Sequence, residues 1–310
     1  MRLWLCMVAA AGLLAVGCGG SGGGGAPPAA PAGAKPVVYV SNYPLQYFTE
    51  KIGLPVIEVR NPVPPEVDPA YWEPTENDIR AMQAADLIVL NGATYESWFE
   101  RVTLPPSKVV DTCATFEDRL IELAGAVTHS HGPEGKHTHA GTAFTTWLDM
   151  GLAIEQARTI HAALAVRWPR HKELFDRQFA GLEQRLRALD AAIVGAIGEK
   201  HEQPVIFSHP IYQYLQRRYG INGETLHWEP DAMPPEEEWR KLRALLARHR
   251  AKWMIWEARP IEAIAERLKR MGLRAAVFRP CAQPPEKGDF ATVMEENIAE
   301  LRRVYGTETE

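Results

Sequence analysis

Residues 171–197 read HKELFDRQFAGLEQRLRALDAAIVGAI, and this stretch determines how the rest of the chain is organised. Its large apolar side chains recur every three or four residues, which is the spacing of one face of an α-helix. They are Phe175, Phe179, Leu182, Leu186, Leu189, Ile193 and Ile197. A helix of about thirty residues extends over roughly 45 Å at about 1.5 Å per residue, which is long enough to brace two lobes. We therefore predict a helical linker over residues 147–200, interrupted once at Pro169.

On either side of this linker, short runs of β-branched residues alternate with helical patterns, as in α/β layers around a mostly parallel sheet. Before it we expect strands at 37–40, 56–59, 85–90 and 109–111, with helices at 44–52 and from 75 onward. After it we expect strands at 205–207, 253–256 and 275–278, an extended segment at 226–228, and helices at 212–219, 236–250, 261–271 and 290–305. The predicted fold class is α/β, with two lobes at 37–146 and 201–306. Each lobe is expected to contain a mostly parallel sheet flanked by helices. One long backbone helix joins the two lobes. Ligands of such sheets bind beyond the carboxyl ends of the strands, so we expect a cleft there.

The N-terminus has the pattern of an exported lipoprotein. Arg2 gives a positive start, residues 3–14 are apolar, and Ala-Val-Gly precedes Cys18. The apolar run is too short to cross about 30 Å of hydrocarbon. We expect a signal peptide at 1–18, a lipid on Cys18 and a flexible Gly/Ala/Pro tether at 19–36. This places a membrane-anchored protein in the periplasm or at the outer face of the cytoplasmic membrane; the alternative is an ordinary secretory signal.

Composition excludes several other classes of function. The net charge of −5 and the ordinary fraction of charged residues give no sign of nucleic-acid binding. No nucleophile elbow, P-loop or His-Glu-x-x-His string is present, so we expect no enzyme. We expect a binding protein that is a monomer. Once Cys6 and Cys18 are assigned to the signal, Cys113 and Cys281 remain. In an oxidising compartment they could form a disulfide or stay as two separate buried thiols.

Many short strings occur in an order and spacing typical of one protein family. They are VSNYPL (40–45), DP (68–69), EPT (73–75), ADLI (85–88), NG (91–92), ESW (96–98), WLD (147–149), FSH (207–209) with Tyr212 and Tyr214, RYG (218–220), and Glu257. On these strings the sequence resembles the zinc/manganese substrate-binding lipoproteins of ABC transporters. The resemblance implies a rigid two-lobe protein that holds Zn²⁺ or Mn²⁺ between its lobes and delivers it to a membrane permease of the importer.

The resemblance also implies metal ligands, from which this sequence departs at three of four positions. Ala70, Thr145 and Arg279 stand where the family has His, His and Asp, and His209 is retained. A lone imidazole does not hold Zn²⁺ against water, and Arg279 would add positive charge where a countercharge is expected. A metal in the cleft would therefore use His209 with partners drawn from Glu257, Glu73, Asp68 and the thiols of Cys113 and Cys281.

Four of the ten histidines lie in one polar segment, residues 128–140, which we predict to be a loop. They form two pairs, His129 with His131 and His137 with His139. Paired imidazoles can chelate Zn²⁺ or Cu²⁺. The resemblance implies the same role, because zinc-type members carry a His-rich insertion here. The alternative is a solvated loop with incidental histidines.

The second hypothesis is that the cleft binds a ligand other than a metal ion. Trp72 and Glu73 stand beside the altered position 70, and Arg279 is expected opposite them. An aromatic wall and a guanidinium suit a small anionic or aromatic ligand, or a partner protein, in a metal-independent member of the fold. Alternatively, Arg279 pairs with Glu73 or Glu257 and fills the site with an internal salt bridge.

Overall fold

The computed structural model describes residues 34–123, 127–130, 136–139 and 141–306; of 127–130 and 136–139 it describes the backbone. The predicted signal peptide, Cys18 and all but the end of the tether lie outside these residues. Residues Lys35–Glu310 form one compact unit. The lobe boundaries drawn from the sequence stay predictions.

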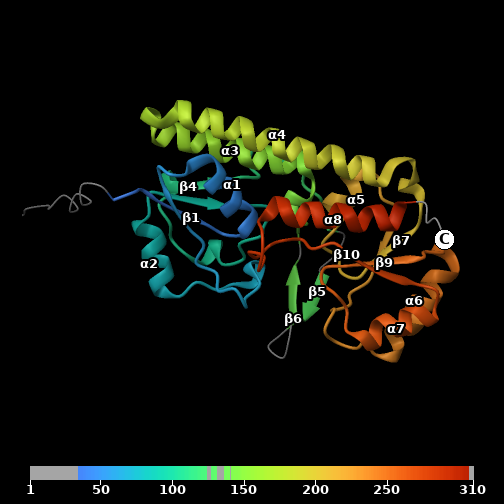
Figure 1. The fold of residues 1–310 in the computed structure, drawn as a ribbon. Helices are drawn as coiled ribbons and strands as arrows, with labels where there is room; N and C mark the ends of the chain where they lie inside the picture. Colours follow the sequence, from blue (N-terminus) through green and yellow to red (C-terminus); the bar gives the residue numbers. More distant parts are fainter. Residues whose placement is uncertain (1–33, 124–126, 131–135, 140, 307–310) are drawn as a thin grey trace, which may run out of the picture. The chain divides into compact units, whose positions relative to one another are not determined.

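Two parallel sheets, each of four strands, form the centres of an N-terminal and a C-terminal lobe (Figure 1). The N-terminal lobe contains β1 (Val37–Val40), α1 (Tyr43–Gly53), β2 (Glu58–Arg60), α2 (Glu76–Ala84), β3 (Leu87–Leu90) and β4 (Val109–Asp111). The C-terminal lobe contains β7 (Val205–Phe207), α5 (Gln213–Tyr219), β8 (Gly223–Thr225), α6 (Glu236–His249), β9 (Trp253–Trp256), α7 (Glu262–Arg270), β10 (Arg274–Val277) and α8 (Phe290–Tyr305). The predicted α/β class with two sheets is confirmed.

Both sheets have the same topology. The strand orders are β2-β1-β3-β4 and β10-β9-β7-β8, so in each lobe the first strand lies between the second and the third. The connections that leave the first and third strands therefore run in opposite directions, and a crevice opens between their carboxyl ends. In the C-terminal lobe this switch point lies between β7 and β9.

The helical linker consists of two helices, α3 (Met150–Arg167) and α4 (Lys172–Ile197). The chain breaks between them at Trp168 and Pro169, as predicted from the proline. The 26 residues of α4 span roughly 39 Å. Helix α4 packs against α1 and α3 on one half and against α8 and α5 on the other, and it runs alongside both lobes in Figure 1. The predicted long backbone helix is confirmed.

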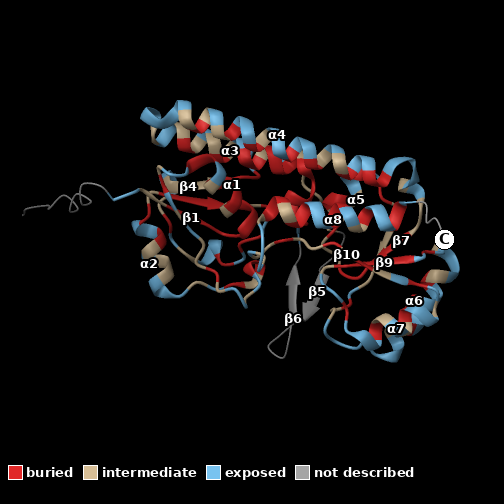
Figure 2. Cartoon of the chain, in the orientation of Figure 1, coloured by how far each residue is buried: buried red, intermediate tan, exposed pale blue. Residues whose placement is uncertain are grey.

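The apolar stripe of α4 explains why the lobes are held together. All seven apolar positions that predicted the helix are buried, and Figure 2 shows the inner side of α4 buried and its outer side exposed. Each such side chain stabilises the fold by roughly 1.5–3 kcal/mol when fully buried. The same hydrophobic cluster contains Val38 and Val89 of one sheet and Val205 and Ile255 of the other. The lobes therefore share one continuous core.

Besides shifts of one or two residues at strand ends, the segment after β7 and the His-rich segment differ from the sequence predictions. Strand β8 precedes the extended segment predicted at 226–228, which continues alongside β7 through the bonds Leu226 N–H to Phe207 O (2.9 Å) and Trp228 N–H to Ser208 O (2.7 Å). The segment predicted as a His-rich loop contains an antiparallel pair, β5 (Val127–Ser130) and β6 (Lys136–His139). In Figure 1 this hairpin points away from α4.

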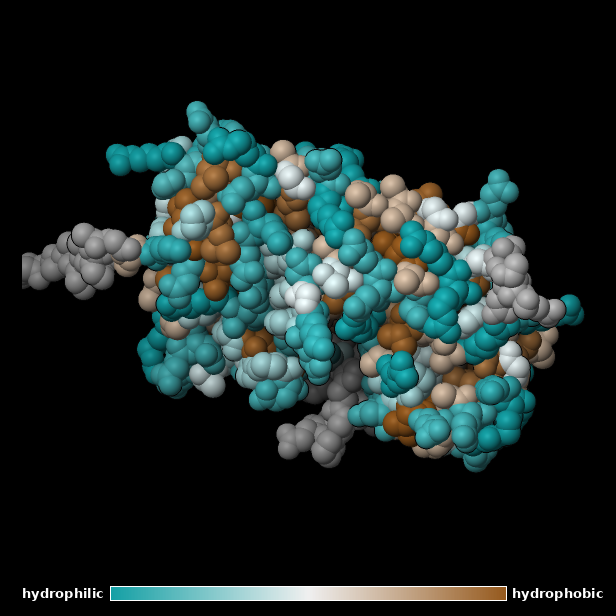
Figure 3. Space-filling model, in the orientation of Figure 1, coloured by the Kyte–Doolittle hydropathy of each residue, from teal (hydrophilic) through white to brown (hydrophobic). Residues whose placement is uncertain are grey.

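Hydrophilic side chains cover most of the face shown in Figure 3, and hydrophobic ones appear in small groups. Within the part of the chain that the structure describes, none of the helices is both long and apolar enough to cross a bilayer.

Candidate metal centre

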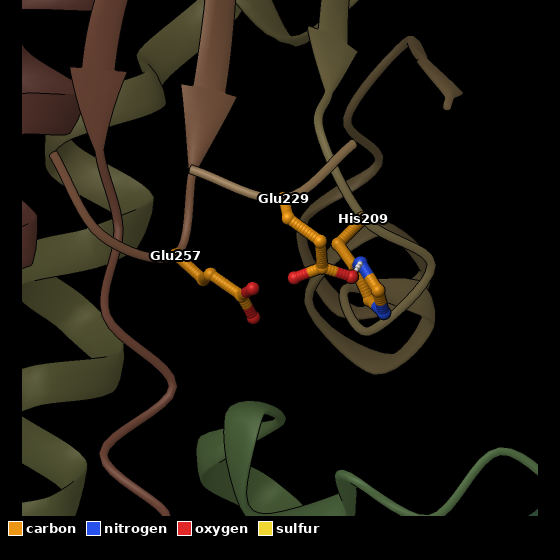
Figure 4. Close-up of side chains that lie close together, drawn as sticks. All are labelled: His209, Glu229 and Glu257. Carbon is orange, nitrogen blue, oxygen red and sulfur yellow. Dashed lines mark ion pairs between the residues drawn. The ribbon is translucent and has the colours of Figure 1, made fainter. Parts of the chain in front are cut away.

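Three potential ligands converge at the switch point of the C-terminal lobe. His209 follows β7, Glu229 follows β8 and Glu257 follows β9, so each side chain comes from the carboxyl end of a neighbouring parallel strand. Their ligand atoms all lie within 4.8 Å of one another, and the side chains point toward a common space (Figure 4). This is a donor set of one imidazole and two carboxylates.

The backbone on both sides of His209 fixes its imidazole. Ser208 N–H donates to Ile255 O at 2.9 Å, and Ile211 N–H donates to His209 O at 3.0 Å. From the other lobe, the Thr145 hydroxyl donates to Ile211 O at 2.6 Å. His209 is only 3% exposed, and its Nδ1 lies 3.5 Å from Oε1 of Glu229. The imidazole therefore has a defined position before any ion binds.

Glu229 reaches the site because the tryptophan before it is anchored. Trp228 is buried against Trp239 and Trp256, with ring centroids 4.6 and 6.3 Å apart. Glu229 is not among the ligands predicted from the sequence. The available signal was its position directly after the predicted extended segment, where the carboxyl-end rule applies.

Glu257 extends from the end of β9, directly after the buried Trp256. Burial, followed by the negative charges of Glu229, Asp68 and Asp231, raises the pKa of Glu257 to about 7. Burial also raises the pKa of the Tyr71 phenol, and the charges of Asp68, Glu229 and Glu257 add to that shift. The site is therefore electronegative, and a bound cation would relieve the repulsion.

The raised pKa of Glu257 predicts how the stability of the metal-free protein depends on pH. In the unfolded chain this carboxyl ionises near its ordinary pKa of 4.5, but in the folded protein it does so near 7. The folded state therefore binds more protons between these values, and stability falls as pH rises from about 4.5 to 7. After discounting for partial solvent access, we expect Glu257→Gln to remove roughly 2 kcal/mol of that fall.

Urea unfolding in EDTA at pH 5 and pH 8, with wild type and Glu257→Gln compared, measures this effect. Buried Glu96, whose pKa is also raised to about 7 by burial, acts equally in both proteins and cancels in the comparison. An identical pH dependence of the two proteins would show that Glu257 ionises normally.

The N-terminal lobe forms the opposite wall of the site. A cavity of about 60 Å³ lies between the lobes. Its lining includes His209 and Glu257 together with Asp68, Ala70, Tyr71, Tyr95, Phe144, Thr145, Trp147, Ile211, Pro280 and Ala282. Ala70 and Thr145, where the resemblance implied histidines, thus face the same cavity as His209. A wider opening of about 710 Å³ shares Asp68 and Glu257 with this cavity and is bordered by residues 279–287.

The internal salt bridge predicted for Arg279 is not formed, although Arg279 does border the wider opening of the cleft with Asp68 and Glu257. Its guanidinium forms an ion pair with Glu296 of α8, and with neither Glu73 nor Glu257. The physical reason is a clamp from Asn297, whose side-chain oxygen accepts from Arg279 N–H at 2.9 Å and whose amide donates to Arg279 O at 2.8 Å. The backbone is thereby held against α8, and Arg279 does not border the cavity of His209.

Trp72 and Glu73 are also wrongly predicted to line the cleft. Trp72 is 6% exposed and packs edge-on against Trp98 at 5.8 Å within the N-terminal lobe. Glu73 is exposed and forms an ion pair with Arg101. Neither borders the cavity of His209. The predicted wall of Trp72 and Glu73 opposite Arg279 is therefore not built.

The disulfide considered for Cys113 and Cys281 is not formed, and the alternative of two separate buried thiols is observed. Cys113 lies under α3 with its Sγ 3.7 Å from the Thr146 hydroxyl, and the Cys281 Sγ points to Gln283 O at 3.9 Å. Burial raises the pKa of the Cys281 thiol to about 12 and that of Cys113 further still. Because the thiolate is the metal ligand, neither suits the role predicted for it.

The histidines of the polar segment are described only in part. His131 lies outside the described residues, and the backbone alone is described for His129, His137 and His139. In the register of β5 and β6, His129 pairs directly with His137.

Comparisons with known proteins agree on one family. The family model described as zinc-uptake complex component A, periplasmic, matches residues 38–304. The zinc-binding lipoprotein AdcA of Streptococcus pneumoniae is 25% identical over 89% of this chain, which spans 57% of that relative's length. The high-affinity zinc uptake system protein ZnuA of Bacillus subtilis is 27% identical over 96% of both chains.

Solved structures show the same fold. The metal-dependent lipoprotein YcdH of Bacillus subtilis has a TM-score of 0.75 at 23% identity, covering 87% of this chain and 99% of that one. The Zn(II)-bound ZnuA-like domain of S. pneumoniae AdcA also has a TM-score of 0.75, at 21% identity, covering 88% and 99%. Since the family model extends from β1 to the last turns of α8, this chain belongs to the family of the periplasmic zinc-uptake complex component A.

Proposed function

We propose that this protein is the extracytoplasmic, lipid-anchored binding component of an ABC importer for zinc or a similar divalent ion. The observation that carries the proposal is the convergence of His209, Glu229 and Glu257 within 4.8 Å at the switch point of a sheet. Imidazole and carboxylate are ordinary ligands of such ions. In this role the protein binds its cargo and passes it as a monomer to a membrane permease, without catalysis and without a nucleic-acid partner.

The size and charge of the site favour an ion over an organic ligand. A cavity of about 60 Å³ has room for an ion and a water or two, because a water takes up about 30 Å³ of liquid. Asp68, Glu229 and Glu257 would repel an anion. The metal-independent alternative therefore finds no support in the cavity of His209.

We further propose that the histidine segment collects ions for the cleft. His129 and His137 stand opposite each other in the β5–β6 register, and directly opposed residues of a hairpin are close enough for cross-strand contact. His131 and His139 complete the proposed set. Binding through so few imidazoles, on a single hairpin, is expected to be weak.

Metal titration of the chain beginning at Lys35 tests both proposals. We expect one tight zinc site, together with weaker binding that disappears when His129, His131, His137 and His139 are all replaced by alanine. The Kd of the tight site should change less than about twofold in that variant, because the cleft ligands are untouched. Loss of the tight site in the hairpin variant would move the principal site to the hairpin and contradict the cleft assignment.

A further inference from the structure

The carboxyl group of Glu96 is buried in the N-terminal lobe, outside the ligand cluster of the C-terminal lobe. Its Oε1 accepts from Asn91 N–H at 2.6 Å, and its Oε2 accepts from Gly92 N–H at 3.1 Å. The Ser41 hydroxyl is hydrogen-bonded to the same carboxyl group. Since Ser41 follows β1 and Asn91 follows β3, these bonds join the carboxyl ends of two neighbouring strands. The strings NG (91–92) and ESW (96–98) thus form one bonded unit.

The turn that Glu96 closes has a left-handed backbone at three successive residues. The φ angle is +78° at Gly92, +51° at Ala93 and +62° at Thr94. Glycine adopts this region readily, whereas Ala93 is strained there and the β-branched Thr94 more so. Such a conformation persists only where the surrounding contacts enforce it. The two bonds from the Glu96 carboxyl group to the start of the turn are contacts of this kind.

The turn determines where the ring of Tyr95 lies. Tyr95 follows it directly, and its N–H donates to Gly92 O at 3.1 Å. The ring packs edge-on against Phe144 and Trp147, with centroids 5.2 and 5.7 Å apart, and all three side chains line the cavity that His209 borders. An apolar wall limits the access of water to a metal site and lowers the local dielectric constant, which strengthens the attraction between an ion and its ligands.

We infer that Glu96 is a positioning residue, which holds the left-handed turn 92–94 and through it keeps the Tyr95 ring in the wall of the ion cavity. The inference rests on the proposed function, since its effect is measured on the ion that the cavity holds. A carboxylate suits this role because its two oxygens accept from two N–H groups at once. A glutamine amide has one acceptor oxygen and would turn its own donors toward the second N–H.

The first test is the Kd of zinc for the chain from Lys35, measured for the wild-type protein and for Glu96→Gln. We expect the Kd to rise by about tenfold in Glu96→Gln, because the released turn moves the aromatic wall and admits water. Glu100→Gln, which changes an exposed carboxylate of the same lobe, is the matched control and should leave the Kd unchanged.

A rescue variant distinguishes positioning through the turn from a general loss of packing. Thr94 is exposed, so Thr94→Gly removes the strain without removing buried contacts. We expect Thr94→Gly to return the Kd of Glu96→Gln to within about threefold of the wild-type value. Spectra of ¹³C-labelled tyrosine in EDTA, with the Tyr95 signal assigned from Tyr95→Phe, should show that signal shifted in Glu96→Gln and restored in the double variant.

The outcomes separate this inference from the proposed function. If Glu96→Gln binds zinc with the wild-type Kd, or if neither the Kd nor the Tyr95 signal is restored by Thr94→Gly, the inference is wrong and the proposed function stands. If the wild-type protein does not bind zinc, both are wrong. Should Glu96→Gln not fold, Ser41→Ala removes one bond to the same carboxyl group more mildly. A wild-type Kd and Tyr95 signal in that variant would overturn the inference.

Discussion

Replacement of His209 by alanine is expected to weaken zinc binding at the cleft by more than about 100-fold. Removal of an outer-shell partner alone typically costs 10–100-fold in metal affinity, and here a direct ligand is lost. His209 supplies the only imidazole of the described cluster, and the remaining carboxylates favour harder ions. Isothermal titration of zinc into the chain from Lys35 measures the change.

Two controls make this result interpretable. His201→Ala removes an exposed imidazole of the same lobe and should leave the Kd unchanged. His209→Gln preserves much of the buried volume, so loss of binding in both His209 variants, with unfolding in EDTA close to wild type, points to lost coordination. If His209→Ala binds zinc with the wild-type Kd, the cleft is not the tight site.

The elements that position this site could be predicted because each depends on local pattern. The stripe from Phe175 to Ile197 requires only helical periodicity, and it marks the buried face of α4. The strand at 253–256 and the helix at 290–305 have the predicted bounds, because an aromatic run and an Asp289 cap with Gly306 beyond define them locally. His209 and Glu257 follow from the rule that ligands lie at strand carboxyl ends.

The wrong predictions concern side-chain directions that depend on tertiary contacts. Arg279 pairs with Glu296 on a helix that begins later in the chain, and Asn297 of that helix holds the Arg279 backbone from both sides. Trp72 is buried because Trp98 lies beside it in the same lobe. Glu229 was missed because its position depends on the packing of Trp228 into a tryptophan cluster. None of these contacts has a signature in local sequence.

The positions of the altered ligands, Ala70 and Thr145, also depend on tertiary contacts. Ala70 and Thr145 come from separate loops of the N-terminal lobe, yet both line the cavity that His209 and Glu257 border from the other lobe. The lining of the site is therefore two-sided, whereas the ligand cluster is drawn from the C-terminal lobe alone. If positions 70 and 145 carried side chains long enough to contact an ion beside His209, both lobes would supply ligands.

The double variant Ala70→His/Thr145→His is therefore expected to bind zinc about 100-fold more tightly than the wild-type protein, because two added imidazoles would complete a tetrahedral nitrogen-rich set. Titration of zinc against a competing chelator measures the gain. Thr145→His also removes the bond to Ile211 O, so the free energy of unfolding in EDTA should fall by about 1 kcal/mol while zinc affinity rises.

The matched control is Ala70→Leu/Thr145→Leu, which adds side-chain volume to the cavity without donor atoms. We expect this variant to bind zinc no better than the wild-type protein, because the added carbon displaces water that would otherwise complete the shell. If the leucine variant gains as much affinity as the histidine variant, the effect comes from packing of the lobes. If the histidine variant gains nothing, positions 70 and 145 do not reach the ion, and the metal lies entirely on the side of His209, Glu229 and Glu257.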